Sequence, residues 1–260
     1  LEERLDERLI IRNGTTFELS KAGELVYREA IVIYGSIARL TTAVRATPHD
    51  LSGIVRIALV TGINSEIFDH VLGEFHKNNP RVTFEILSGS SEYVKQNLLN
   101  YTASIGVCLK YRKHAELSDT LLLSQKYNLY CGKDHHLYQQ EHISIRALRD
   151  EFFVSFASEQ LDGVLAPLAI YRAQERLEGR IVGTSDNLEE VRRMIKAGLG
   201  IGALPENAVQ QDVLSGNLWQ LPPYDGLARI SLYLMWNKMP KFSEAEEVFF
   251  SALMAALQNK

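Results

Sequence analysis

The sequence predicts an α/β protein with two similar halves, and three of its features lead to this prediction. From residue 53 onward, short apolar runs rich in β-branched residues alternate with segments of helical periodicity. This alternation is typical of parallel strands connected by helices. The pattern occurs over 54–109 and again over 152–197. A long helical segment with a narrow apolar seam precedes both halves, so a separate helix is expected in front of them.

Composition limits the classes of protein to which the chain can belong. Its 260 residues, 46% of them hydrophobic and 23% charged, suffice for one large or two medium globular domains. No apolar run approaches the roughly 18 residues that a membrane span needs. The 28 basic and 32 acidic residues give a net charge of -4, so any contact with DNA must come from a local basic patch.

Cysteine content and the first residues bear on the cellular compartment. The chain contains two cysteines, and its beginning does not combine basic residues, an apolar stretch and a cleavage site as an export signal would. We therefore expect a cytoplasmic protein. Because Leu1 lies within a charged helical pattern and is not an initiator Met, we also expect that part of the natural N-terminus is missing.

The first 47 residues predict a hairpin followed by a long helix. Residues 1–9 have the pattern of a helix end, and Asn13-Gly14 favours the positive φ of a tight turn. Ser20 can cap the long helix because its hydroxyl can accept from the free amides of the first turn. Pro48 ends that helix, since proline lacks an amide hydrogen and disfavours helical geometry in the residue before it.

The long helix carries its apolar residues in one narrow row. They recur at alternating spacings of four and three residues, as in a heptad repeat. A helix that lies on a globular body usually has a wider apolar face, so the row favours pairing with a second helix. The predicted dimerisation seam consists of Val26, Ala30, Ile33, Ile37, Leu40 and Val44.

The two halves can be divided into elements by their periodicity and their turns. In the first half, strands are expected at 54–60, 82–87 and 105–109, parallel to one another, with a helix after each of the first two. A long extended stretch at 121–131 leads into the second half. There the expected elements are strands at 152–156 and 180–184 and helices at 164–177 and 187–197. A strand at 228–236 and a helix at 242–257 are expected to follow the second half.

Several local motifs resemble those of LysR-type transcriptional regulators. They are LEERLDERLIIR at the start, FELSKAGELV at 17–26, GIVRIALV at 53–60, EFHKNNPRVTFEILSGSS at 74–91 and MIKAGLGIGALP at 194–205. The resemblance implies the end of a winged helix-turn-helix over 1–19 and a linker helix over 20–47. It also implies an effector-binding region of two Rossmann-like subdomains, as in type II periplasmic binding proteins. These subdomains are expected at 52–124 with 228–260, and at 125–227.

The resemblance further implies a DNA-binding regulator that works as a homodimer or homotetramer. A small molecule in the cleft between the subdomains would shift their placement and alter DNA binding. Arg12 matches the family's wing arginine, which approaches the DNA backbone; a solvated surface arginine is the alternative. A solute-binding receptor is the alternative function. It would need an export signal and no heptad helix.

Polar turns that follow the predicted strands supply the candidate effector-binding residues. In open α/β sheets, ligands bind beyond the carboxyl ends of the strands, where free amides and helix dipoles favour anions. Plain helix capping is the alternative role for any single residue of these turns. Together with two apolar contacts, the turns favour a small organic acid or polar metabolite. The candidates are Thr61, Asn64, Ser65, Ser88, Ser90, Phe156, Ser185, Ile201 and Gly202.

The remaining motifs favour structural roles. The glycines at 198, 200 and 202 follow a helix and do not precede one, so a nucleotide fingerprint is not expected, and Gly198 is expected to end that helix in left-handed geometry. The seven histidines lack metal-binding spacing and are expected at the surface. Cys108 and Cys131 are expected to be inert core thiols. We therefore expect no catalytic residue, metal, cofactor or enzymatic activity.

The seam can be tested by placing charges in it. Replacing Ile33 and Ile37 by Asp would bury unpaired charges in the helix pair, at a cost on the order of several kcal/mol. We expect the assembly to fall apart into smaller units in sedimentation experiments. An unchanged oligomer size would contradict the predicted seam.

Overall fold

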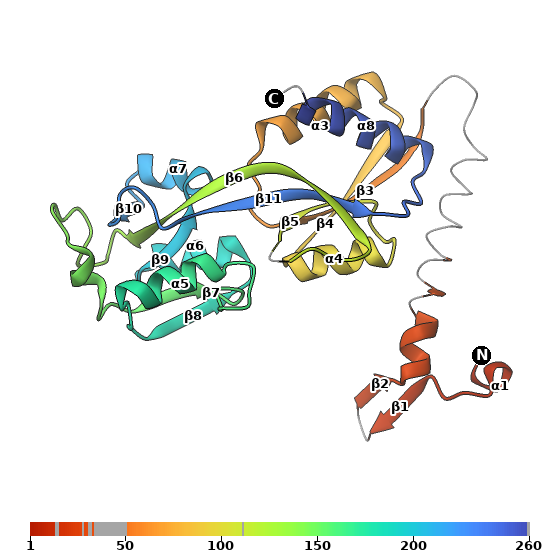
Figure 1. The fold of residues 1–260 in the computed structure, drawn as a ribbon, viewed down its shortest axis with the longest axis horizontal. Coiled ribbons are helices and arrows are strands. Elements are labelled where there is room, and N and C mark those ends of the chain that lie inside the picture. The colour runs from red at the N-terminus through yellow and green to blue at the C-terminus, as the bar shows by residue number, and fades with distance from the viewer. Residues whose placement is uncertain (14–15, 28, 31–32, 34–50, 111, 259–260) are drawn as a thin grey trace.

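The computed structural model describes residues 1–13, 16–27, 29–30, 33, 51–110 and 112–258. Figure 1 shows an N-terminal hairpin and helix, and an α/β body in which two lobes are joined by long strands. Of the predicted seam, Val26 is half-buried, and Ala30 and Ile33 are exposed. The other three seam residues, Ile37, Leu40 and Val44, lie outside the described residues. The seam therefore stays a prediction.

The N-terminal hairpin forms as expected, but the helix before it is shorter than predicted. Helix α1 covers only Glu2–Leu5, and Asp6 ends it in left-handed geometry with φ 51°. The chain folds back because the Glu2 carboxylate accepts hydrogen bonds from the amides of Leu9 (2.6 Å) and Ile10 (3.1 Å). Strands β1 (Ile10–Asn13) and β2 (Thr16–Leu19) then pair antiparallel.

Ser20 and Gly23 join the segment after β2 to the hairpin. The Ser20 hydroxyl accepts a hydrogen bond from the Gly23 amide at 2.9 Å, which confirms the predicted helix cap. It also donates to the carbonyl of Arg8. A Cβ atom on Gly23 would lie 2.0 Å from the carbonyl oxygen of Leu9, so only glycine allows this close approach of helix and hairpin.

The first lobe, lobe I, contains residues 51–110, 112–116 and 238–258 and the adjoining ends of two long strands. Its core is a parallel sheet covered by helices on both faces. Strand β3 (Gly53–Val60) lies between β4 (Val82–Gly89) and β5 (Ile105–Leu109), and both neighbours are parallel to it, as predicted. Helices α3 (Glu66–Asn78) and α8 (Glu244–Gln258) pack together on one face, and α4 (Ser91–Leu99) covers the other (Figure 1). The strands are apolar on both sides because both sides are covered.

Two long antiparallel strands connect the lobes. Strand β6 (Leu117–Gly132) pairs with β11 (Ala228–Asn237) along the whole of β11, from Ala228 opposite Tyr127 to Asn237 opposite Leu117. In lobe I, β11 lies beside β5; in lobe II, β6 pairs with β9 (Gly202–Pro205) and β10 (Leu218–Leu221). The predicted subdomain boundary at 124/125 therefore falls within a continuous strand.

Lobe II contains residues 133–227, which form the second α/β unit. Strands β7 (Phe153–Phe156) and β8 (Ile181–Ser185) are parallel, and Phe153 also forms a parallel bridge with Ile201 just before β9. The lobe also contains a short 3-10 helix and three α-helices. These are Ile145–Leu148, α5 (Ala166–Glu175), α6 (Leu188–Lys196) and α7 (Glu206–Leu214). Helix α7 and strand β10 were not expected from the sequence, because both are short and lack a clear period.

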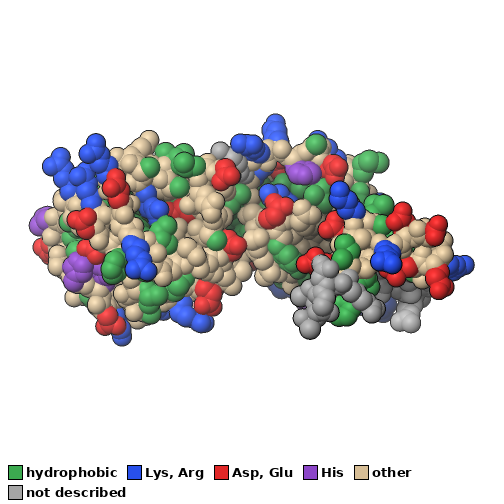
Figure 2. All heavy atoms as spheres, turned by 90° about the horizontal axis from the view of Figure 1, so that it is seen from below, with side chains coloured by type: hydrophobic (Ala, Val, Ile, Leu, Met, Phe, Trp, Pro, Cys, Tyr) green, Lys and Arg blue, Asp and Glu red, His purple; other side chains and the backbone are tan. Residues whose placement is uncertain are grey.

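Surface charge and hydropathy agree with the composition. On the face shown in Figure 2, basic and acidic side chains are interspersed, with no extended patch of one sign among the described residues. In the described part of the chain, no helix is both long and apolar enough to cross a bilayer.

The packing of α8 on lobe I gives a test of the fold. Phe249 is fully buried and meets the rings of Phe75 and Phe84 edge-on, at centroid distances of 5.0 and 5.2 Å. Phe249→Ala should lower the free energy of unfolding by about 3 to 5 kcal/mol. Val248→Ala, at an exposed site on the same helix, should change it by less than about 0.5 kcal/mol. Equal unfolding midpoints in urea, followed by circular dichroism, would contradict this packing.

Candidate functional site

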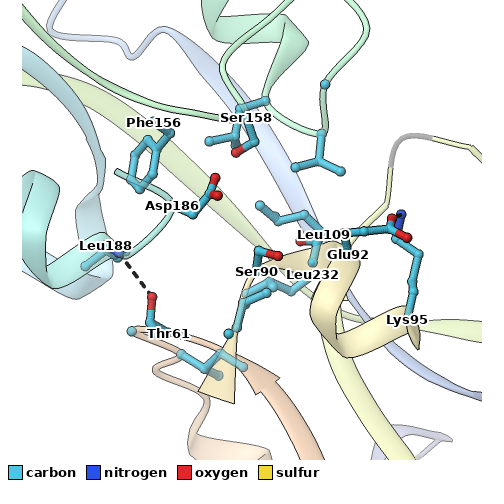
Figure 3. A pocket seen from close by; sticks show the side chains of 18 of the residues that line it. Thr61, Ser90, Glu92, Lys95, Leu109, Phe156, Ser158, Asp186, Leu188 and Leu232 are labelled. Carbon is cyan, nitrogen blue, oxygen red and sulfur yellow. Dashed lines mark hydrogen bonds and ion pairs between the residues drawn. The ribbon is translucent and has the colours of Figure 1, made fainter. Parts of the chain in front are cut away.

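A cavity of about 550 Å³ lies between the lobes, beyond the carboxyl ends of the lobe I strands (Figure 3). Thr61 follows β3, Ser90 follows β4, and Leu109 ends β5. This is where open parallel sheets bind ligands. The lining residues are Val60, Thr61, Gly62, Ile63, Gly89, Ser90, Ser91, Glu92, Lys95, Leu109, Arg112, Lys113, His114, Gln125, Tyr127, Phe156, Ser158, Asp162, Gly163, Val164, Leu165, Asp186, Leu188 and Leu232.

Thr61 ties the two lobes together at one side of the cavity. Its Oγ1 accepts a hydrogen bond at 3.1 Å from the amide of Leu188, the first residue of α6, as the dashed line in Figure 3 shows. Gly62 has φ 71°, and a Cβ atom there would lie 3.0 Å from the Leu188 side chain. The start of α6 therefore gives one of its free amides to lobe I. The next amide, that of Glu189, is capped by the Asn187 side chain at 2.9 Å.

The start of α4 keeps two amides for a ligand. Ser90 caps this helix by accepting from the Tyr93 amide at 3.2 Å. Within the described residues, the amides of Ser91 and Glu92 have no hydrogen-bond partner, and both residues line the cavity. The first amides of a helix lack intrahelical acceptors, and together with the helix dipole they attract negative charge. The α4 terminus is therefore suited to an anionic or polar acceptor group.

The shared strand β6 contributes a polar floor that sequence reasoning missed. Gln125 and Tyr127 are two residues apart on β6, so both face the cavity, and Leu232 of β11 lies beside them. Burial raises the pKa of the Tyr127 hydroxyl, with a further contribution from the charge of Glu159, so this tyrosine stays protonated and can donate a hydrogen bond. In the sequence, Gln125 and Tyr127 differ from their neighbours only as two side chains with hydrogen-bonding groups at alternate positions of an extended stretch.

Charged residues of the cavity are divided between the lobes. Lobe I supplies Lys95, Arg112 and Lys113, whereas the lobe II lining has no basic side chain and supplies Asp162 and Asp186. Glu92 belongs to lobe I and forms an ion pair of 2.9 Å with Lys95. Hydrogen bonds from Gln96 and then from Lys95 lower the pKa of the Glu92 carboxyl. The cavity is thus more basic on the lobe I side and acidic on the lobe II side.

The structure brings three of the nine predicted effector-site residues to this cavity: Thr61, Ser90 and Phe156. Ser65 lies outside it because its hydroxyl is buried as the cap of α3, where it accepts from the Phe68 amide at 3.4 Å. Ser88 is a strand residue of β4 and does not line the cavity. Ser185 is held in its own turn, accepting from the Asn187 amide at 3.1 Å. Ser65 and Ser185 therefore have the local hydrogen-bonding role that was the alternative for single residues of these turns.

Asn64 also lies outside the cavity, in a second contact between the lobes. Its side-chain amide donates to the backbone carbonyl of Asn207 at 3.3 Å. The side-chain amide of Asn207 donates to the backbone carbonyl of Asn64 at the same distance. Asn207 belongs to α7. Together with the hydrogen bond between Thr61 and Leu188, this reciprocal pair holds the loop after β3 against lobe II.

The glycine run after α6 serves packing within lobe II. Gly198 follows the C-cap of α6 with φ 79° and donates to the Ile195 carbonyl, which confirms the predicted left-handed helix end. Ile201 is fully buried beside β7 and does not line the cavity. A Cβ atom on Gly202 would lie 2.5 Å from the Val154 carbonyl oxygen. Gly202 therefore allows a close approach to strand β7, and it does not line the cavity.

Other predicted residues are placed as follows. Arg12 lies on β1, opposite Phe17 in the hairpin register. Both cysteines are buried, which confirms their predicted place in the core, and burial raises the pKa of Cys108 and of Cys131 to about 12. The expectation of surface histidines is wrong for His135, whose side chain is only 7% exposed.

The comparison with protein families decides between the classes that share this fold. Residues 48–258 match the model of the LysR substrate binding domain. The chain belongs to the LysR family. It is 28% identical over 238 residues to the uncharacterized HTH-type transcriptional regulator YwbI of Bacillus subtilis (strain 168), covering 92% of this chain and 78% of that protein. The protein is a LysR-type transcriptional regulator with an effector-binding domain.

Solved structures show the same fold at lower sequence identity. The effector-binding domain of QuiR in complex with shikimate has a TM-score of 0.66 and 16% identity, and the match covers 80% of this chain and 99% of that one. The regulatory domain of CcmR from Synechocystis PCC6803 in complex with 2-PG has the same TM-score and 19% identity, with the same coverage of both chains. These likenesses confirm the predicted type II periplasmic-binding-protein fold.

The contact between Thr61 and Leu188 can be tested by amide exchange. Thr61→Val removes the acceptor of the Leu188 amide, and an unpaired buried donor costs about 1 to 3 kcal/mol. Hydrogen exchange at Leu188 should therefore become about tenfold faster, measured by mass spectrometry or NMR. Thr184→Val, at an exposed position of β8, is the matched control. The contact would be refuted if Leu188 exchanged equally fast in both variants.

Proposed function

We propose that the cavity between the lobes binds a small organic acid that carries a second polar group. The observation that carries this proposal is the start of α4. Ser90, Ser91 and Glu92 line the cavity there, and the amides of Ser91 and Glu92 have no intrahelical acceptor. A carboxylate placed there would accept charge-assisted hydrogen bonds. Basic side chains of lobe I stand on the same side of the cavity.

The lobe II wall of the cavity indicates the second polar group of the ligand. Ser158 and Asp186 of lobe II face the cavity, and Gln125 and Tyr127 lie on the shared strand (Figure 3 shows Ser158 and Asp186). These side chains can bind a hydroxyl or amino group of the ligand. Phe156 and Leu232 supply apolar contacts for its carbon skeleton. A ligand of this kind touches both lobes at once.

Contact with both lobes is what would make the ligand an effector. A ligand shifts a conformational equilibrium only by its difference in affinity for the two arrangements. The loop after β3 already contacts lobe II through Thr61 and Asn64. A ligand beside Thr61 would stabilise one separation of the lobes, and the change would reach the DNA-binding segments through the predicted linker helix.

The assembly and the DNA contact complete the proposal. We assign dimerisation, or a tetramer built from dimers, to the helix predicted over 20–47, and contact with the DNA backbone to the hairpin with Arg12. The heptad row and the position of Arg12 in the hairpin support these assignments. The alternative of a solute-binding receptor is disfavoured, because the relatives that match over most of the chain are HTH-type transcriptional regulators.

The effector class can be tested with a panel of small carboxylates, each beside its uncharged methyl ester. We expect at least one carboxylate to raise the melting temperature of the protein while its ester does not. Ser90→Ala should then weaken that carboxylate by about 1 to 2 kcal/mol, or roughly tenfold in Kd. Ser88→Ala removes the same hydroxyl two residues earlier, outside the cavity, and should leave the Kd unchanged. Esters that bind as well as acids, or equal losses in both variants, would contradict the proposal.

A further inference from the structure

A cluster of two histidines and one glutamate lies outside the cavity, at the end of lobe II where β6 ends. His135 and His136 lie three and four residues after the end of β6, in a turn where the His135 amide donates to the Gly132 carbonyl at 3.1 Å. Glu151 is fifteen or sixteen residues further along and stands just before β7. The fold therefore brings together the two ends of the segment 133–151.

The side chains of the cluster converge on a common point. The Nε2 atom of His136 lies 2.9 Å from Glu151 Oε1, and the Nε2 atom of His135 lies 3.5 Å from Glu151 Oε2. The two imidazole rings stack with their centroids 4.6 Å apart. One ligand atom from each of the three residues lies within 4.8 Å of the other two. Neighbouring residues in a strand would point apart, so it is the turn that places both imidazoles on one side.

Two imidazole nitrogens and one carboxylate oxygen form a donor set that zinc prefers. Zinc sites open to solvent commonly have three such protein ligands and a water molecule as the fourth. The exposure of the cluster fits this arrangement. The side chains of His135 and Glu151 are 7% and 15% exposed and form a floor, whereas His136 is 64% exposed and leaves one side accessible.

We propose that His135, His136 and Glu151 bind a divalent transition-metal ion of the zinc class. The ion would link the beginning of the segment 133–151 to its end. Binding requires one local change, because the Leu137 amide donates to Nδ1 of His135 at 3.3 Å. A metal at Nε2 places the ring proton on Nδ1, so the ring must turn out of this long contact between near neighbours. His136 is exposed and can adjust freely.

Zinc titration of the metal-stripped full chain tests the site. Isothermal titration with Zn²⁺ alone, near pH 7.5, should give one site per chain, and Co²⁺ should give the visible absorption of a four-coordinate site. Glu151→Gln and His136→Ala should each weaken Zn²⁺ at least about tenfold, because even residues behind metal ligands typically contribute about 10- to 100-fold. His142→Ala, an exposed histidine outside the cluster, is the matched control and should bind as the unsubstituted chain does.

His136→Ala is the decisive variant because its side chain is mostly solvent-exposed, so the fold should survive its loss. Circular dichroism and the melting temperature without metal check this. In the unsubstituted chain, Zn²⁺ should also raise the melting temperature, and in His136→Ala it should not. Equal Zn²⁺ affinity in His136→Ala and His142→Ala, or no Zn²⁺ binding by the unsubstituted chain, would overturn the proposal.

Discussion

The antiparallel pairing of β6 with β11 is the constraint on which the rest of the structure depends. The two strands run through both lobes, so each lobe builds its own elements onto a common pair. The pair fixes where the lobes face each other. It also brings Gln125 and Tyr127 of β6 and Leu232 of β11 to the base of the space between them. The cavity is a consequence of two lobes that share this strand pair and face each other across one gap.

The chemistry of the cavity follows from which helix starts remain free. At α6, the Leu188 amide is used by Thr61 and the Glu189 amide by Asn187, so this terminus joins the lobes. At α4, the cap on Ser90 satisfies the Tyr93 amide, and the cavity-lining residues Ser91 and Glu92 keep amides without an intrahelical acceptor. Two polar turns that look alike in sequence therefore have different roles. One holds the lobes together, and the other is available to a ligand.

This difference explains how far the sequence could predict the site. Strand and helix positions follow from periodicity, and the parallel orientation of β3, β4 and β5 was predicted correctly. Ser65 and Ser90 are both helix caps after parallel strands, but only the fold shows that Ser90 faces the cavity. Ile201 was expected to touch a ligand and instead packs beside β7, because the bridge with Phe153 buries it. Local pattern predicts capping, whereas facing a cavity depends on contacts between distant segments.

The same reasoning applies to the histidines. The spacing of His135 and His136 matches no metal motif, because their third partner, Glu151, is brought to them by the path of the chain between β6 and β7. The pairing of β6 and β11 was itself visible only in part, as two extended stretches. Contacts of high sequence separation decide both sites, and one sequence alone carries little information about them.

NMR of the ¹⁵N-labelled protein tests most directly whether a carboxylate binds at the start of α4. On titration with a carboxylate that stabilises the protein, the amide resonances of Ser91 and Glu92 should shift most. The amides of Glu66 and Ile67, at the matching start of α3 outside the cavity, should stay in place. Shifts centred on α3, or a saturating carboxylate that leaves the amide resonances of Ser91 and Glu92 unchanged, would contradict carboxylate binding at the start of α4.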